Sequence, residues 1–340
     1  MLESLAVFLR GYVWEPAVER RQPFRRDACF GVGAVARLGE LALGAARVAA
    51  IVSPSLPADD LRRVERALGR PLTTLVRAAG PLTDTAVSSL LDELERIRPD
   101  LLVGVGGGTV LDVAKATARR LECRLVLVPT TLSGAEHTSN AAIWVGGRKT
   151  VNRVEPAHAV VADPDLLVRQ FDLLGPTALH AVAHTLTIRR DRTLGAPSLA
   201  ALALAALDDV LLALEDETLD DGTPLRFMRG AWNAAVAIGL TGPKFGPHHL
   251  LAHRLVRPDQ AHARVSATVL CATLLASDLY DDVVEQLPID DAASRLRRVA
   301  ERWLERLDLQ ELEPAEVDVR TFDEEWRADC RVMLEALGRV

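Results

Sequence analysis

The chain has 340 residues, of which 49% are hydrophobic and 26% are charged, a composition typical of a soluble globular protein. Its length suggests about two domains with a sizeable core, and its formal net charge of −7 argues against nucleic acid as the main partner. No apolar run reaches the roughly eighteen residues that a membrane span needs. The start of the chain lacks the basic residues of a signal peptide. The 4 cysteines are far apart and form no CxxC pair, which predicts reduced thiols and a cytoplasmic protein.

The first half of the chain alternates short apolar segments with charged amphipathic ones. Residues 1–29 predict an irregular arm or an edge hairpin, and residues 30–34 predict a turn that opens a helix. Predicted buried strands cover residues 47–52, 72–76, 101–105 and 124–128, and predicted helices cover residues 35–42, 59–69 and 84–97. Strands that alternate with helices in this way predict a doubly wound parallel sheet.

The most informative stretch is LLVGVGGGTVLDVAKA, residues 101–116. A buried strand runs into Gly106, Gly107 and Gly108, and Thr109 is placed to cap a helix that carries Asp112. Glycines allow an anion to approach the backbone closely, and the N–H groups and dipole of a helix start attract it. The pattern predicts a phosphate site, although an ordinary strand-to-helix turn without a ligand is the alternative.

Two further loops follow predicted parallel strands, at residues 53–57 and 129–136. The carboxyl ends of parallel strands lie at one edge of a sheet, where ligands of such folds bind. We therefore expect the three loops to converge.

The composition changes near residues 160–170, where strand-like runs give way to Ala- and Leu-rich segments. These predict an α/β dinucleotide-binding domain over residues 1–163 and an all-α domain over residues 164–340. Predicted helices there include residues 198–216, 227–240 and 263–280, followed from about residue 290 by exposed amphipathic helices.

Six of the 8 histidines fall in two clusters within the helical half. His180 and His184 are four residues apart, as are His249 and His253, so each pair shares one face of a helix. His248 and His262 complete the second cluster. Such pairs suit a divalent metal or a proton relay, and the alternative is a set of separate histidines with ordinary hydrogen bonds.

Several of these motifs resemble one family. GGGTVLDVAK is similar to the GGGSxxDxAK signature of the iron-containing (group III) alcohol dehydrogenases, and PTTLSGAE, with Ala135 in place of the usual Ser, resembles their PTTxxGSE loop. FGVGAVARL resembles the first glycine turn of the family, and ADPDL its domain boundary. HHLLAHRLVRPDQAH is similar to a histidine run of the maleylacetate reductase branch. The resemblance implies a dehydroquinate synthase-like fold.

The resemblance also implies roles in binding a nicotinamide nucleotide. Gly106, Gly107, Gly108 and Thr109 would hold its pyrophosphate, and Asp112, Thr130, Thr131 and Ser133 would line the path to the nicotinamide. Ser53 stands where an Asp favours NAD, so that NADP is also accommodated. Lys149 would polarise a carbonyl or hold a carboxylate.

Two interpretations of the histidines remain open at this point. A metal, Fe²⁺ or Zn²⁺, would be held by His180, His184, His249 and His262, with His180 in place of the family's Asp. The second interpretation, which we favour, needs no obligatory metal. Catalysis then depends on His253, His249, His184 and Lys149, with His253 or His249 as the general acid.

We therefore expect an NAD(P)H-dependent reductase of a carbonyl or enoate on a small, carboxylated substrate, as a homodimer without nucleic-acid or membrane partners. One alternative is a metal-dependent alcohol dehydrogenase. Another is a family member converted to a lyase, cyclase or non-redox protein that still binds nucleotide. Ala178 and Thr187 depart from the family pattern, and Arg254 and Arg257 would favour an anionic substrate if they faced the site.

Overall fold

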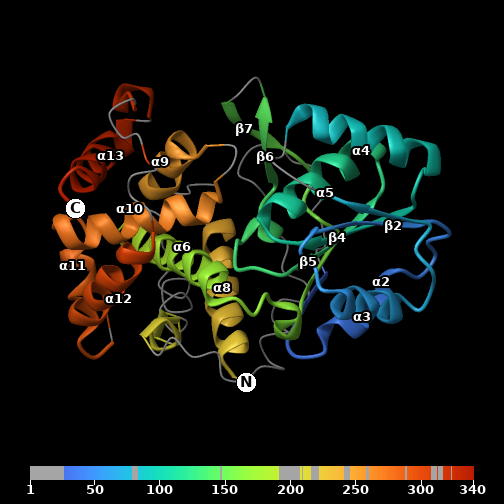
Figure 1. Ribbon diagram of the computed structural model, residues 1–340, viewed down its shortest axis with the longest axis horizontal. Helices are drawn as coiled ribbons and strands as arrows, with labels where there is room; N and C mark the ends of the chain where they lie inside the picture. Colours follow the sequence, from blue (N-terminus) through green and yellow to red (C-terminus); the bar gives the residue numbers. More distant parts are fainter. Residues whose placement is uncertain are drawn as a thin grey trace. The chain divides into compact units, whose positions relative to one another are not determined.

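The computed structural model describes residues 27–78, 83–145, 148–190, 207–208, 210–215, 222–240, 246–257, 260–287, 289–307, 312, 317–322 and 324–340. The chain forms two compact units that divide between Val168 and Arg169. Figure 1 shows the strands of the first unit and the helices of the second. None of the described helices has the length and apolar character needed to cross a membrane.

The first unit contains a six-stranded sheet in the order β1-β8-β5-β4-β2-β3, in which every neighbouring pair is parallel. The strands are β1 (Asp27–Phe30), β2 (Val48–Val52), β3 (Thr74–Arg77), β4 (Leu101–Gly106), β5 (Arg124–Pro129) and β8 (Ala159–Ala162). The predicted parallel sheet and its four predicted strands are confirmed. Because β2, β4 and β5 are buried along their length, they are continuous apolar runs rather than alternating ones.

Residues 1–29 were expected to form an irregular arm or an edge hairpin. Residues 27–29 instead belong to β1, an edge strand that pairs in parallel with β8. Only four residues long, β1 pairs with a strand far away in the chain, so the local sequence carries no signal for it. Residues 1–26 lie outside the described part.

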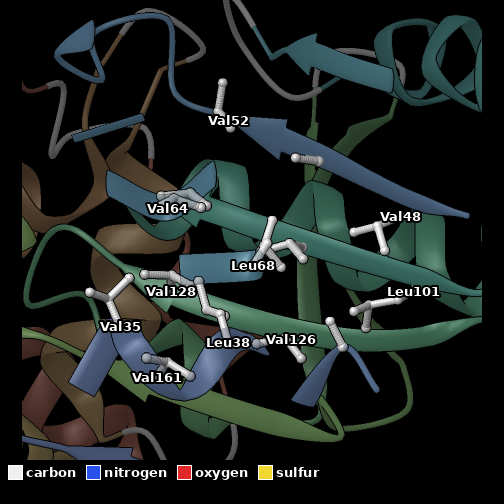
Figure 2. Packing of buried hydrophobic residues seen from close by; sticks show 14 of the residues in the cluster. Val35, Leu38, Val48, Val52, Val64, Leu68, Leu101, Val126, Val128 and Val161 are labelled. Atoms are coloured by element: carbon white, nitrogen blue, oxygen red, sulfur yellow. The ribbon is translucent and has the colours of Figure 1, made fainter. Parts of the chain in front are cut away.

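Helices cover both faces of the sheet (Figure 1). On one face lie η1 (Ala34–Arg37), α2 (Leu38–Leu41) and α3 (Ala58–Leu68), and on the other lie α4 (Asp84–Ile97) and α5 (Gly108–Leu121). Each face of the sheet has its own hydrophobic core, and the side chains of β2 alternate between these two cores. Val48 and Val52 pack with Val64 and Leu68 of α3 (Figure 2), whereas Ile51 packs in the core under α4 and α5.

The strand order places a topological switch point between β2 and β4. From β2 the chain passes through α3 to β3 on one side, and from β4 it passes through α5 to β5 on the other. The two connecting helices lie on opposite faces, so the carboxyl ends of β2 and β4 border the crevice in which doubly wound folds bind their ligands.

Two further features of this unit, in addition to β1 and β8, were not predicted. Strands β6 (Asn140–Val145) and β7 (Arg148–Arg153) form an antiparallel hairpin, and β6 packs against α5. The Asp163 carboxylate accepts hydrogen bonds from the backbone N–H groups of Gly33, Val35 and Asp165 at 3.1–3.2 Å. The ADPDL segment thus ties the end of β8 to the first glycine turn. It includes η3 (Pro164–Leu166).

The second unit is helical, as predicted. Its helices are α6 (Phe171–Arg190), α8 (Thr223–Leu240), α9 (Pro247–Leu255), α10 (His262–Ala276), α11 (Asp281–Val284), α12 (Ala292–Arg306), η6 (Val319–Thr321) and α13 (Glu324–Leu337). The buried α10 packs against α6, α9, α12 and α13. Of the helix predicted over residues 198–216, residues 207–208 and 210–215 are described and helical, and the others lie outside the described part.

The C-terminal helices are less exposed than the sequence predicts. Trp303 of α12 and Met333 of α13 are fully buried, because the apolar faces of both helices pack against α10. The predicted amphipathic helices are confirmed, but only their charged outer faces are exposed.

Candidate functional site

The glycine loop joins β4 to α5 at the switch point. Gly106 ends the strand, Gly107 is the N-cap in extended conformation, and α5 begins at Gly108. The predicted cap at Thr109 is wrong, because Thr109 is the second residue of the helix and the N-cap makes no side-chain hydrogen bond. The first N–H groups of α5 therefore have neither an intrahelical partner nor a side-chain cap, which leaves them available to an anion.

The loop after β5 packs directly against the glycines. A Cβ atom added to Gly107 would lie 3.2 Å from the side chain of Thr131, and one added to Gly108 would lie 3.1 Å from the Cβ of Ser133. The N–H of Thr130 donates to the carbonyl of Gly106 at 3.0 Å. Larger residues at these glycines would push the two loops apart, so the glycines are required by close approach and not only by flexibility.

The third loop lies on the other side of the glycine loop. The N–H of Ser53 donates to the carbonyl of Val105 at 2.9 Å, which fixes the start of the 53–57 segment beside the end of β4. The structure thus brings together the nucleotide-site residues predicted on the three loops.

Asp112 and Lys115 of the same motif make structural contacts. The buried ammonium of Lys115 donates to the carbonyl of Ala135 at 2.8 Å, to the hydroxyl of Thr138 at 3.0 Å and to the carbonyl of Asn140. It also pairs with the Asp112 carboxylate at 2.7 Å.

The other Asp112 oxygen accepts from the N–H of Ala142 at 3.0 Å. Together the two side chains attach α5 to η2 (Ala135–His137) and to β6.

Lys149 lies on β7, opposite Trp144 in the hairpin. Burial lowers the pKa of its ammonium, and the nearby charge of Asp112 opposes that shift. Lys149 is thus a partly buried cation on the same side of α5 as Asp112. No contact joins it to the glycines of the loop among those described.

The six histidines of the second unit come together from three helices. His180 and His184 lie on α6, His248, His249 and His253 lie on α9, and His262 begins α10. The Nε2 atoms of His180 and His184 are 3.1 Å apart, and those of His249 and His253 are 2.9 Å apart. The prediction that each pair shares a helix face is confirmed.

The cluster contains two overlapping groups that could hold a metal ion, His180–His184–His249 and His249–His253–His262. In each group the ligand atoms lie within 4.8 Å of one another, and His249 is common to both. Burial and the neighbouring imidazoles hold the pKa of His249 well below its usual range, so its ring is neutral as a metal ligand must be. The donor set is entirely imidazole, which suits Zn²⁺ and other late divalent metals, and neither group contains a carboxylate.

Two residues that support the cluster, Ser266 and Thr187, had no site role in the sequence predictions. The hydroxyl of Ser266 bonds to Nδ1 of His180 at 2.7 Å. The hydroxyl of Thr187 donates to the carbonyl of Ala183 at 3.0 Å and lies 3.2 Å from Nδ1 of His248.

Because the Thr187 proton is used, His248 carries its proton on Nδ1, and its buried Nε2 has no hydrogen-bond partner among the described residues. The spacing of Thr187, three residues after His184 on α6, was the available signal.

Arg254 was expected to favour an anionic substrate if it faced the site. Its side chain is exposed, and its guanidinium lies over the ring of Phe322, 5.8 Å from the ring centroid. This contact gives Arg254 a packing role on α9.

Comparison with known proteins agrees with the motifs. Residues 26–164 match the sequence model of the family described as iron-containing alcohol dehydrogenase. The predicted resemblance to this family is confirmed. Maleylacetate reductase 2 from Cupriavidus pinatubonensis is 33% identical over 178 residues, which cover 50% of this chain and 49% of the relative. Phosphonoacetaldehyde reductase from Streptomyces viridochromogenes is 33% identical over 258 residues, covering 62% and 63%.

The alignment thus spans about half of the first relative's length and 63% of the second's. The likeness in fold extends further. The crystal structure of maleylacetate reductase from Agrobacterium tumefaciens superposes with a TM-score of 0.71 over 96% of this chain and 98% of that one, at 23% identity. The iron-containing alcohol dehydrogenase fold therefore includes both units.

Proposed function

We propose that this protein is an NAD(P)H-dependent reductase that acts on a carbonyl or enoate of a small, carboxylated substrate. The observation that carries the proposal is the uncapped start of α5 behind Gly106–Gly108, at the switch point of a doubly wound sheet. The names of the two relatives support the chemistry, since maleylacetate and phosphonoacetaldehyde are small anionic carbonyl compounds.

The first unit would bind the nucleotide. N–H groups at Gly107, Gly108 and Thr109 hold the pyrophosphate, and Thr131 and Ser133 fix the shape of the loop that faces it. When bound, NAD(P)H supplies a hydride to the substrate. Lys149, a partly buried cation, would hold a substrate carboxylate or polarise the carbonyl that is reduced.

A histidine would supply the proton that balances the hydride. We assign this role to His253, which is half-buried and therefore reachable, and whose Nε2 shares a proton with Nε2 of His249 at 2.9 Å. The depressed pKa of His249 keeps that ring neutral, so His249 returns the proton to His253 rather than retaining it. His184 lies behind this pair, with its ring 5.3 Å from that of His249.

The deciding experiment is fluorescence titration of the purified protein with NADH and NADPH, with metal content measured on the same sample. We expect saturable binding of at least one nucleotide, followed by oxidation of that nucleotide with keto acids or enoates. If neither nucleotide binds, the glycine loop is not a nucleotide site and the proposal is wrong.

A second candidate, a metal-dependent alcohol dehydrogenase, is favoured by the two imidazole groups. His180, His184, His249 and His262 would hold the ion, which would polarise the substrate oxygen. One bound Zn²⁺ or Fe²⁺ per chain, lost together with activity in a chelator, would establish this candidate. Full activity of a metal-free sample would establish the metal-independent reductase that we favour.

We further propose that the protein is a cytoplasmic homodimer. The short β1 forms one edge of the described sheet, and edge strands are a common place for two copies of a protein to pair. Light scattering after size-exclusion chromatography measures the mass directly, and a mass of one chain would contradict the dimer.

A further inference from the structure

The loop after β2 borders the nucleotide crevice and carries no acidic residue. In doubly wound nucleotide-binding folds, a carboxylate at the end of the strand beside the glycine-loop strand holds the ribose 2′-hydroxyl of NAD and repels the 2′-phosphate of NADP. Here that position is Ser53, in the segment Ser-Pro-Ser-Leu-Pro. Its hydroxyl lies 2.8 Å from that of Ser55 and accepts from the N–H of Ser55 at 3.3 Å.

An arginine lies beside these two hydroxyls. Arg77 ends β3 and pairs in register with Val52, the last residue of β2, so it lies one strand further out from the glycine loop. Its Nη1 donates to the carbonyls of Ser53 at 3.3 Å and Pro54 at 3.5 Å. These bonds hold the exposed guanidinium at the loop.

The rest of the Arg77 guanidinium remains available to a ligand. Its Nε and Nη2 make no hydrogen bond, and no carboxylate pairs with it, among the residues that the structure describes. By contrast, Asp59 in the first turn of α3 is paired with Arg62 of the same helix. Arg77 therefore places a positive charge at the ends of β2 and β3, and its donors form the planar fork that suits a phosphate.

We propose that Ser53, Ser55 and Arg77 form a site for the 2′-phosphate of NADPH, and that the protein prefers NADPH to NADH. The inference rests on the proposed function, because it places the adenosine ribose between the glycine loop and the end of β2. One of the two serine hydroxyls donates to the other, and the second donates to a phosphate oxygen. Nε and Nη2 of Arg77 supply a charge-assisted pair.

The test compares the dissociation constants of NADPH and NADH for the full chain and for Arg77→Gln, by nucleotide fluorescence. We expect the unmodified protein to bind NADPH about tenfold or more tightly than NADH, and Arg77→Gln to lose about tenfold in NADPH affinity while NADH binding is unchanged. Arg96→Gln, which removes an exposed charge from α4, is the matched control and should alter neither constant.

Two further measurements separate the phosphate site from a general electrostatic effect. Ser53→Asp should weaken NADPH binding by about tenfold or more and leave NADH binding intact or improved. 2′,5′-ADP should displace NADPH at lower concentration than 5′-ADP, and Arg77→Gln should remove that difference.

Equal affinity of the unmodified protein for both nucleotides, or an equal loss of both in Arg77→Gln, would overturn the phosphate site while leaving the proposed reductase intact. Binding of neither nucleotide would overturn both.

Discussion

Replacement of Lys115 by Met tests whether the lysine of the glycine motif has a structural role. The side chain is fully buried, and its ammonium makes three hydrogen bonds and the ion pair with Asp112. Methionine keeps most of the side-chain volume, so the cavity is small and the main loss is polar. Removing one partner of a buried pair leaves the other charge and the carbonyls of Ala135 and Asn140 without their donor, which costs about 3–5 kcal/mol.

The free energy of unfolding can be measured by urea denaturation followed by circular dichroism. The matched control is Lys149→Met, in the same unit. Burial lowers the pKa of Lys149, so the folded state disfavours its charge and the control should cost little. A loss below about 1 kcal/mol for Lys115→Met, or one equal to the control, would refute the structural assignment.

A double-mutant cycle sharpens the same test. Once Lys115 is absent, Asp112 has lost its cation, so Asp112→Asn should cost less in Lys115→Met than in the unmodified protein. We expect a coupling of about 0.5–3 kcal/mol. Additive losses would show that the 2.7 Å ion pair contributes nothing to stability.

Three further outcomes follow from the geometry. Gly108→Ala should keep the fold by circular dichroism but lower nucleotide affinity about tenfold in a fluorescence titration, because its Cβ would press on the loop after β5; unchanged affinity would contradict this account of the loop. His253→Ala should reduce turnover about a hundredfold with nucleotide affinity unchanged, as steady-state kinetics and titration would show; an equal loss of both would exclude His253 as the proton donor. Thr187→Val should lower the free energy of unfolding by about 1 kcal/mol, since it removes the acceptor of the buried His248. Thr185→Val, which removes only a bond to its own helix, should cost less in the same urea experiment.

Much of the sheet could be predicted because its central strands are buried on both faces and the glycines between them mark the turns. Strands β2, β4 and β5 carry apolar runs of the expected length. The edge strand β1 and the hairpin β6–β7 could not be predicted, because half-exposed strands lack a continuous apolar run and their pairing depends on partners elsewhere in the chain.

The candidate site likewise has features that the sequence predicts and features that only the fold determines. The histidine pairs could be predicted, since a spacing of four residues fixes a shared helix face. The junction of the two pairs at His249 depends on how α6, α9 and α10 pack, which the spacing does not contain. The role of Lys115 could not be predicted either, because its partners are the backbone carbonyls of Ala135 in η2 and Asn140 in β6, and only the fold determines where these elements lie.

The crevice between β2 and β4 also has a consequence for how the protein folds. Val52 and Val105 are neighbours in the sheet, although α3, β3 and α4 separate β2 from β4 in the chain. The proposed nucleotide site therefore exists only after this long-range parallel pairing has formed, which is a slow event in folding. A nucleotide would bind the folded chain and not its unfolded precursors, so it would raise the free energy of unfolding. In a cell, the supply of nucleotide would then influence how much of this protein survives proteolysis.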